Sequence, residues 1–116
     1  MEYSCMTLIR NCLLALSLTA LLPAAHAQVN ADAAKALAEK NLCFSCHKVE
    51  EKLVGPSYRD VANKYKGVAD AQAKLAANIK KGGKGVWGTV PMPPTSGVSD
   101  EDLKTIAAWI LSLSYR

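Results

Sequence analysis

Two thiols and an imidazole lie within one short stretch of this chain, Cys43-Phe44-Ser45-Cys46-His47. The spacing Cys-x-x-Cys-His is typical of the attachment site of a c-type haem. Each sulfur can add to one vinyl group of the haem, and the adjacent His47 can then reach the iron. The motif therefore predicts one covalent haem c, attached through Cys43 and Cys46.

The same residues have two other interpretations, a thioredoxin-like redox pair and half of a zinc site. A zinc site needs four ligands, and Cys5, Cys12 and His26 precede residue 28, in a segment that has the pattern of a signal peptide. A thioredoxin-like site needs a strand and a helix around it, and no strand-like alternation surrounds this motif. Haem attachment is favoured over both, which stay open as alternatives.

The first 27 residues have the pattern of a secretory signal peptide. Arg10 supplies a positive charge, an uncharged apolar run extends from Cys12 to Leu22, and Ala25-His26-Ala27 matches a cleavage site. The run is shorter than the about 20 apolar residues that span a bilayer. An uncleaved anchor is the alternative, because Glu2 weakens the positive region.

We therefore expect residues 1–27 to be a cleaved signal peptide and residues 28–116 to form one small domain. Export agrees with the motif, because c-type haem is attached outside the bacterial cytoplasm. The expected location is the periplasm, and we expect a monomer with no integral membrane span in the mature form.

Met92 is the candidate for the second iron ligand. After residue 27 the chain contains one His and one Met, so Met92 is the only thioether that can face the iron opposite His47. Pro93 biases Met92 toward an extended backbone, and the prolines on both sides stiffen the segment. Three alternatives are a Met that fills a gap in the core, an open site, and a lysine ligand. The nearest lysines in the sequence are Lys80, Lys81 and Lys84.

Two filled axial positions leave no place for a substrate on the iron, and an imidazole with a neutral thioether raises the reduction potential. We therefore predict a carrier of single electrons between redox proteins, and not an enzyme. The alternatives are a haem-based ligand sensor with Met92 dissociated and the haem module of a peroxidase-like enzyme.

The formal net charge is +4, and it does not change when Glu2 and Arg10 leave with the first 27 residues. A mildly basic surface suits transient docking to acidic redox proteins. It is too weakly basic and too poor in arginine clusters to indicate nucleic-acid binding. Five lysines flank the segments expected around the haem edge, where they form either a docking ring or an ordinary solvated surface. They are Lys48, Lys52, Lys80, Lys81 and Lys84.

The sequence pattern predicts an all-α fold of four to five short helices around the haem. Helices are expected from Asn30 to about Leu42, from Ser57 to about Lys64, from Ala69 to Lys81, and from Ser99 onward. In the first helix the residues at helical spacing are Ala33, Ala36, Leu37 and Lys40. In the third the inward stripe is Leu75, Ala76 and Ile79, and in the last it is Leu103, Ile106, Ala107 and Ile110.

The chain from 28 to 116 resembles the small bacterial class I cytochromes c, in particular the periplasmic type that donates electrons to dissimilatory nitrite reductase. The resemblance covers nearly all of this segment. Besides Cys43 to His47 it includes Val54-Gly55-Pro56 followed by Tyr58, Gly85-Val86-Trp87-Gly88, Pro91-Met92-Pro93-Pro94, and the last helix with Trp109.

The resemblance implies a compact helical fold with thioether bonds at Cys43 and Cys46 and axial ligation by His47 and Met92. It implies that the Pro56 carbonyl accepts a hydrogen bond from the other ring nitrogen of His47. Trp87 is implied to donate its indole N–H to a haem propionate, the alternative being a plain core aromatic. Trp109 is expected to pack between helices. The resemblance favours nitrite reductase as the electron acceptor, and a terminal oxidase and a peroxidase are the alternatives.

Two positions depart from the pattern of the family. Relatives often carry Asn three residues after the ligand Met, where it supports the sulfur, and this chain has Thr95. They often carry a basic residue near a propionate at the position of Asn78. Both changes affect the tuning of the haem and leave the ligand set as it is.

Overall fold

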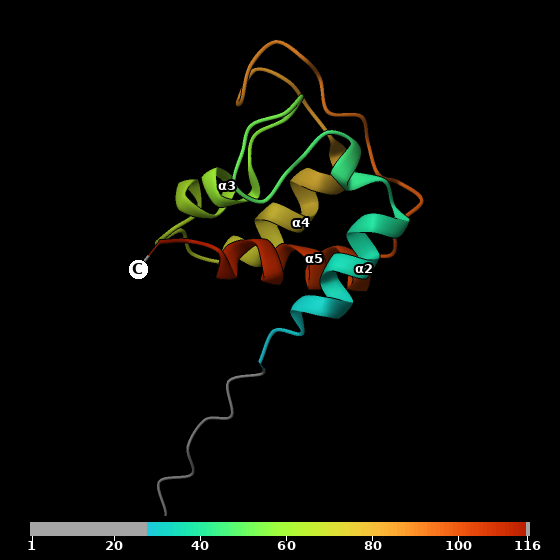
Figure 1. Cartoon of the computed structure of the whole chain (residues 1–116), viewed down its shortest axis with the longest axis vertical. Coiled ribbons are helices and arrows are strands. Elements are labelled where there is room, and N and C mark those ends of the chain that lie inside the picture. The colour runs from blue at the N-terminus through green and yellow to red at the C-terminus, as the bar shows by residue number, and fades with distance from the viewer. Residues whose placement is uncertain (1–27, 116) are drawn as a thin grey trace, which may run out of the picture.

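The computed structural model describes residues 28–115. Four α-helices and one short 3-10 helix make up its regular structure (Figure 1): α2 (Ala31–Lys40), η1 (Cys43–Ser45), α3 (Tyr58–Lys64), α4 (Ala71–Lys81) and α5 (Asp100–Ser112). The described residues contain no strand, only an isolated bridge between Gly83 and Met92. The prediction of an all-α fold is confirmed. The expected signal peptide, residues 1–27, lies outside the described residues.

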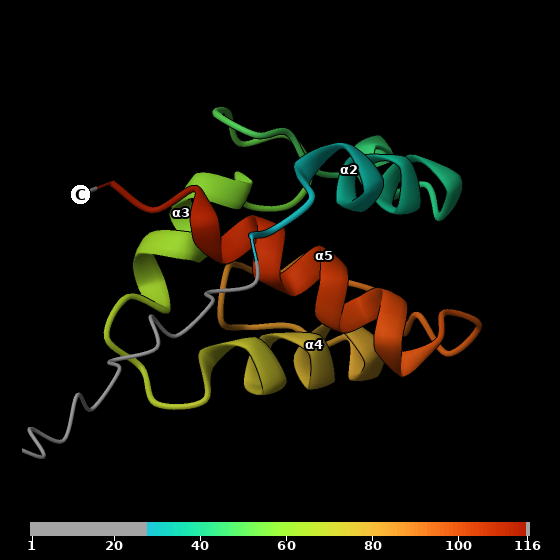
Figure 2. The ribbon, with the colours of Figure 1, turned by 90° about the horizontal axis from the view of Figure 1, so that it is seen from below.

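The last helix, α5, is the element on which the others pack. α2, α3 and α4 each contact α5, while they make no contacts with one another as helices. α4 and α5 lie side by side and run in opposite directions (Figure 2). The predicted stripe of α5 is correct, because all four of its residues and Trp109 are buried. Burying such a stripe contributes most of the stability of a short helix.

Three helices begin at the polar side chains that the sequence indicated. The side chains of Asn30, Ser57 and Ser99 each accept a hydrogen bond from a backbone N–H in the first turn of α2, α3 and α5, respectively. Such caps satisfy N–H groups that have no partner within the helix. The remaining helix, α4, has no such cap. It begins at Ala71 and not at the predicted Ala69, because Asp70 adopts a left-handed backbone.

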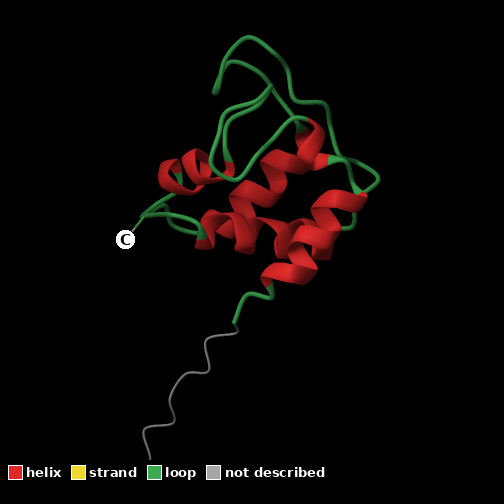
Figure 3. Cartoon of the chain, in the orientation of Figure 1, coloured by secondary structure: helices red, strands yellow, loops and turns green. Residues whose placement is uncertain are grey.

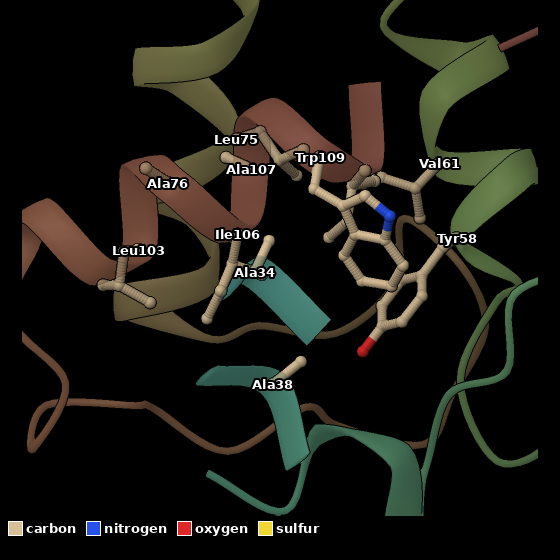
Figure 4. Close-up of a cluster of buried hydrophobic side chains, with 11 residues drawn as sticks. Ala34, Ala38, Tyr58, Val61, Leu75, Ala76, Leu103, Ile106, Ala107 and Trp109 are labelled. Carbon is tan, nitrogen blue, oxygen red and sulfur yellow. The ribbon is translucent and has the colours of Figure 1, made fainter. Parts of the chain in front are cut away.

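The buried face of α2 is not the one that the residues noted at helical spacing would form. Ala34 and Ala38 are the buried residues, and they lie in the cluster around Trp109 and Ile106 (Figure 4). Of the predicted positions only Leu37 is partly buried, while Ala33, Ala36 and Lys40 are exposed. An alanine-rich helix offers little contrast between its faces, so its periodicity did not determine which face packs.

The irregular segments lie together on one side of the helices (Figure 3). One contains residues 46–57 and follows η1, and the other contains residues 82–99 and joins α4 to α5. These segments carry the predicted site residues outside η1. None of the helices in the described part of the chain is long and apolar enough to cross a membrane.

A strained residue, Leu42, lies just after the end of α2. The helix ends at Lys40 and not near Leu42, because Leu42 has a left-handed backbone with φ 58°. Its side chain is 74% exposed, so packing does not compensate for this conformation. A left-handed backbone costs a non-glycine residue about 1–2 kcal/mol, and glycine is the usual residue at this position after a helix.

We expect Leu42→Gly to raise the free energy of unfolding by about 0.5–1 kcal/mol, after allowance for the greater freedom of glycine in the unfolded chain. This free energy is measured by chemical denaturation, with the loss of helix monitored by circular dichroism. Ala36→Gly is the matched control, because it places the same residue at an exposed position inside α2 and should lower the free energy by about 1 kcal/mol. A loss of stability in both variants would contradict the strain at Leu42.

Candidate functional site

The thiols and the imidazole of the motif are brought together by a tight turn. Cys43 begins η1, and its carbonyl accepts hydrogen bonds from the N–H groups of Cys46 (3.2 Å) and His47 (3.1 Å). The Cys43 side chain is half-buried and Cys46 is exposed. Burial raises the pKa of the Cys43 thiol, since a low-dielectric surrounding disfavours the thiolate.

His47 has a defined tautomer. Its Nδ1 lies 2.7 Å from the carbonyl oxygen of Pro56, and a carbonyl can only accept, so Nδ1 carries the proton and donates it. The lone pair is then on Nε2, the nitrogen available to a metal. The hydrogen bond that the resemblance implied is therefore present, and it orients the ring as a ligand requires.

Two further residues confine the His47 ring, and the sequence did not single out either for this role. A side-chain carbon at Gly55 would lie 2.8 Å from Nδ1 of His47 and closer still to Cε1, so only glycine fits. Gly55 N–H also donates to the Cys46 carbonyl at 2.8 Å. The Tyr58 ring stacks on His47 at 17° with centroids 5.3 Å apart. The sequence signal for Gly55 was its place in the Gly-Pro turn.

Tyr58 links the motif to the core. Its ring packs edge-on against Trp109, with centroids 5.3 Å apart (Figure 4). Its hydroxyl is buried and makes no hydrogen bond among the described residues. Burial above all, and then the nearby Cys43, raise the pKa of Tyr58, so the phenol stays neutral.

Met92 lies in the second irregular segment, where its backbone pairs with Gly83. Gly83 N–H donates to the Met92 carbonyl (3.0 Å), and Met92 N–H donates to the Gly83 carbonyl (2.8 Å). The Met92 side chain is half-buried. The pairing holds the segment against the end of α4, in agreement with a restrained position for the sulfur.

A cavity of about 550 Å³ joins these elements. Its lining includes five of the six predicted site residues, namely Cys46, His47, Pro56, Trp87 and Met92. The sixth, Cys43, lines a smaller cavity of about 120 Å³ that shares Cys46, His47 and Met92 with the larger one. The larger volume lies within the range of about 300–1,000 Å³ usual for ligand and cofactor sites.

The cavity and its donors fit a covalently attached haem. Apolar side chains from four helical and loop segments form much of its wall, among them Val54, Val61, Leu75, Ile79 and Ile110. The available donors are two thiols, one imidazole nitrogen and one thioether, which is the set that c-type haem uses. No three His, Cys, Asp or Glu side chains between residues 28 and 115 are arranged to hold a metal ion by themselves. The two thiols, the imidazole and the thioether therefore fit a covalent haem better than a zinc ion.

The five predicted surface lysines do not form one ring. Lys52, Lys81 and Lys84 line the cavity. Lys48 forms an ion pair with Glu51, and Lys80 pairs with Asp100 at the start of α5. The hydrogen bond from Lys80 lowers the pKa of the Asp100 carboxyl. The docking hypothesis therefore narrows to the three lysines at the cavity.

Two contacts near Trp87 and Asn78 were not predicted. The Lys64 ammonium lies 5.1 Å from the centre of the Trp87 ring, so the indole is not a plain core aromatic, and its side chain is 38% exposed. The amide of Asn78 donates to the Tyr65 hydroxyl at 2.6 Å. No local pattern indicated either pair, because each joins separate elements.

Comparison with known proteins is consistent with this site. Residues 31–114 match the family model described as cytochrome c. Cytochrome c-552 of Nitrosomonas europaea is 53% identical over 95 residues, 82% of this chain and 88% of that protein. Cytochrome c-551 of Pseudomonas aeruginosa is 53% identical over 70 residues, 60% of this chain and 66% of that protein.

The solved structures show the same fold. The crystal structure of wild-type Nitrosomonas europaea cytochrome c552 superposes with a TM-score of 0.66 at 53% identity, and the match covers 68% of this chain and 98% of that one. The class 1 cytochrome MtoD from Sideroxydans lithotrophicus ES-1 gives a TM-score of 0.63 at 42% identity, and the match covers 74% of this chain and 98% of that one.

The close fit of Gly55 against His47 gives a direct test of the site. Gly55→Ala should lower the free energy of unfolding by about 1–3 kcal/mol through overpacking and should displace the imidazole, which the NMR signal of the Nδ1 proton reports. Gly97→Ala is the control, because a carbon there meets nothing within 4 Å, and it should be neutral or stabilising by about 0.5 kcal/mol. Equal behaviour of the two variants would show that Gly55 does not constrain the ring.

Proposed function

The chain belongs to the cytochrome c family of small single-haem electron carriers, and we propose that it works in the periplasm and delivers electrons to nitrite reductase or a terminal oxidase. The observation that carries the proposal is that Cys46, His47 and Met92 border one cavity. The imidazole of His47 and the thioether of Met92 could bind a haem iron, and the sulfur of Cys46 could attach the haem to the chain. The sensor and peroxidase alternatives are not favoured, since the relatives are cytochromes c-551 and c-552.

Each candidate residue has a part in this proposal. Cys43 and Cys46 would hold the haem through their sulfurs, and His47 and Met92 would bind its iron. The Pro56 carbonyl keeps the Nδ1 proton of His47 in place, and Nε2 is thereby left to coordinate. Trp87 would donate its indole N–H to a haem propionate, and the neighbouring Lys64, whose ammonium lies over the Trp87 ring, would add a positive charge near it.

The chain's residues would perform the transfer by holding their positions. A bound haem supplies a one-electron iron couple. His47 is confined by Gly55, Pro56 and Tyr58, so it can keep one orientation in both oxidation states. Met92 is neutral, and its sulfur favours the ferrous state more than a harder ligand would. Little movement during transfer means that little reorganisation of the protein accompanies each electron.

The surface around the cavity supports transient docking. Lys52, Lys81 and Lys84 provide positive charge, and exposed apolar side chains of Val54, Val86 and Val90 lie among them on the cavity lining. Positive charge steers an acidic partner into encounter, and a small apolar contact permits rapid release. We propose that a partner of this kind approaches the cavity from this side.

The ligand assignment is tested with the visible spectrum of the purified protein and of Met92→Ala. The wild type should show sharp c-type bands on reduction and the weak far-red sulfur-to-iron band when oxidised. Met92→Ala should keep the c-type bands, lose the far-red band, bind CO rapidly when reduced and have a lower potential, because the sulfur ligand is gone. An unchanged far-red band and potential in the variant would exclude Met92 as a ligand.

The docking surface is tested by charge reversal and stopped-flow transfer to purified nitrite reductase and terminal oxidase. Lys84→Glu should slow association about tenfold at low salt, and the effect should fade at about 1 M salt, where the screening length is about 3 Å. Lys35→Glu makes the same charge change on the exposed side of α2 and should change the rate less than twofold. Equal effects would indicate a response to net charge alone.

The location is tested separately by cell fractionation and mass spectrometry of the purified protein. Cleavage before Gln28 and recovery with the periplasmic fraction are the expected results. A chain that retains residues 1–27 and sediments with membranes would favour the uncleaved anchor. Neither result depends on which enzyme accepts the electron.

A further inference from the structure

Thr95 joins the segment that carries Met92 to the end of α4. Its backbone N–H donates to the carbonyl of Lys80 at 3.1 Å, and its hydroxyl donates to the carbonyl of Ile79 at 2.9 Å. Both carbonyls belong to the last turn of α4, where a helix has no partner for them. Thr95 therefore caps two free carbonyls of a helix that ends far from it in the sequence.

The same helix end holds the other side of Met92. Gly82 follows α4 directly, and a side-chain carbon there would lie 2.5 Å from the Met92 carbonyl oxygen and 2.8 Å from the backbone of Pro93. Gly83 then pairs with Met92 through two backbone hydrogen bonds. Met92 is thus held between the Gly82-Gly83 contact and the Thr95 cap, and both depend on the C-terminal end of α4.

The Thr95 hydroxyl cannot also support the sulfur. A hydroxyl has one proton to donate, and here the carbonyl of Ile79 receives it. Any effect of Thr95 on the Met92 sulfur must therefore pass through the backbone of the segment. A hydrogen bond of this kind contributes most when its loss leaves a carbonyl without a partner.

We propose that Thr95 is a positioning residue for Met92, which keeps the thioether directed at the iron by capping α4 and not by hydrogen bonding to the sulfur. The inference rests on the proposed role of Met92 as a ligand. It assigns a distinct means of support to a position where this chain departs from the residue usual in its family.

The test compares Thr95→Val, which removes the hydroxyl and keeps the shape, with Thr95→Ser, which keeps the hydroxyl. The control is Thr105→Val, because the Thr105 hydroxyl also donates to a helix carbonyl, that of Glu101 at 3.1 Å, but lies within α5. Three properties are measured on each haem-loaded protein: the far-red band against pH, the rate of CO binding after reduction, and thermal unfolding.

Thr95→Val should raise the fraction of molecules with Met92 off the iron about fivefold, the factor expected from one hydrogen bond of ordinary net strength. The CO rate should rise by the same factor, and the far-red band should be lost at lower pH. Thr95→Ser and Thr105→Val should match the wild type in both properties.

Two results would overturn the inference, and they have different meanings. If Thr95→Val lowers only the unfolding temperature, while the band and the CO rate match those of Thr105→Val, Thr95 supports the fold and does not position the ligand. If the wild type has no far-red band, Met92 is not a ligand, and the inference fails together with the ligand assignment.

Discussion

The side chains of residues 28–115 do not fill the space between the helices and the two irregular segments. The buried cluster includes the inner face of α5, and three of its members, Val61, Leu75 and Ile110, also line a cavity of about 550 Å³ with largely apolar walls. Small domains bury a smaller fraction of their surface than large ones, and they commonly depend on an additional covalent or metal-based support. Residues of α3, α4, α5 and both irregular segments line this cavity, so the group that it is shaped to hold would join these elements.

The environment of His47 comes from three kinds of contact within a few residues of one another. The Pro56 carbonyl accepts a hydrogen bond from Nδ1–H of His47, Gly55 permits the close approach of the backbone, and the Tyr58 ring covers one side of the imidazole. Tyr58 provides that ring and also packs on Trp109, so the orientation of the ligand is coupled to the packing of α5. The chemistry of the site and the stability of the fold thus share residues and cannot vary independently.

The sequence was informative where the determining interactions are local. The caps at Ser57 and Ser99 and the stripe of α5 follow from short-range chemistry and periodicity, and the haem motif is contiguous. Contacts between distant segments were not predictable in this way. The pairing of Lys80 with Asp100, the stacking of Tyr58 on His47 and the cap that Thr95 provides to α4 each depend on the finished fold.

The packing of α2, α3 and α4 on α5, and not on one another, has a consequence for the order of events during synthesis. The element that all three require, α5, follows them in the chain and is therefore synthesised after them. Until residues 100–112 have been made, the earlier segments have no helix to pack against, and short helices alone are marginal in water. Until then the growing chain lacks the surface on which its earlier helices pack, and the motif, whose Phe44 packs against Trp109 of α5, has no core beside it.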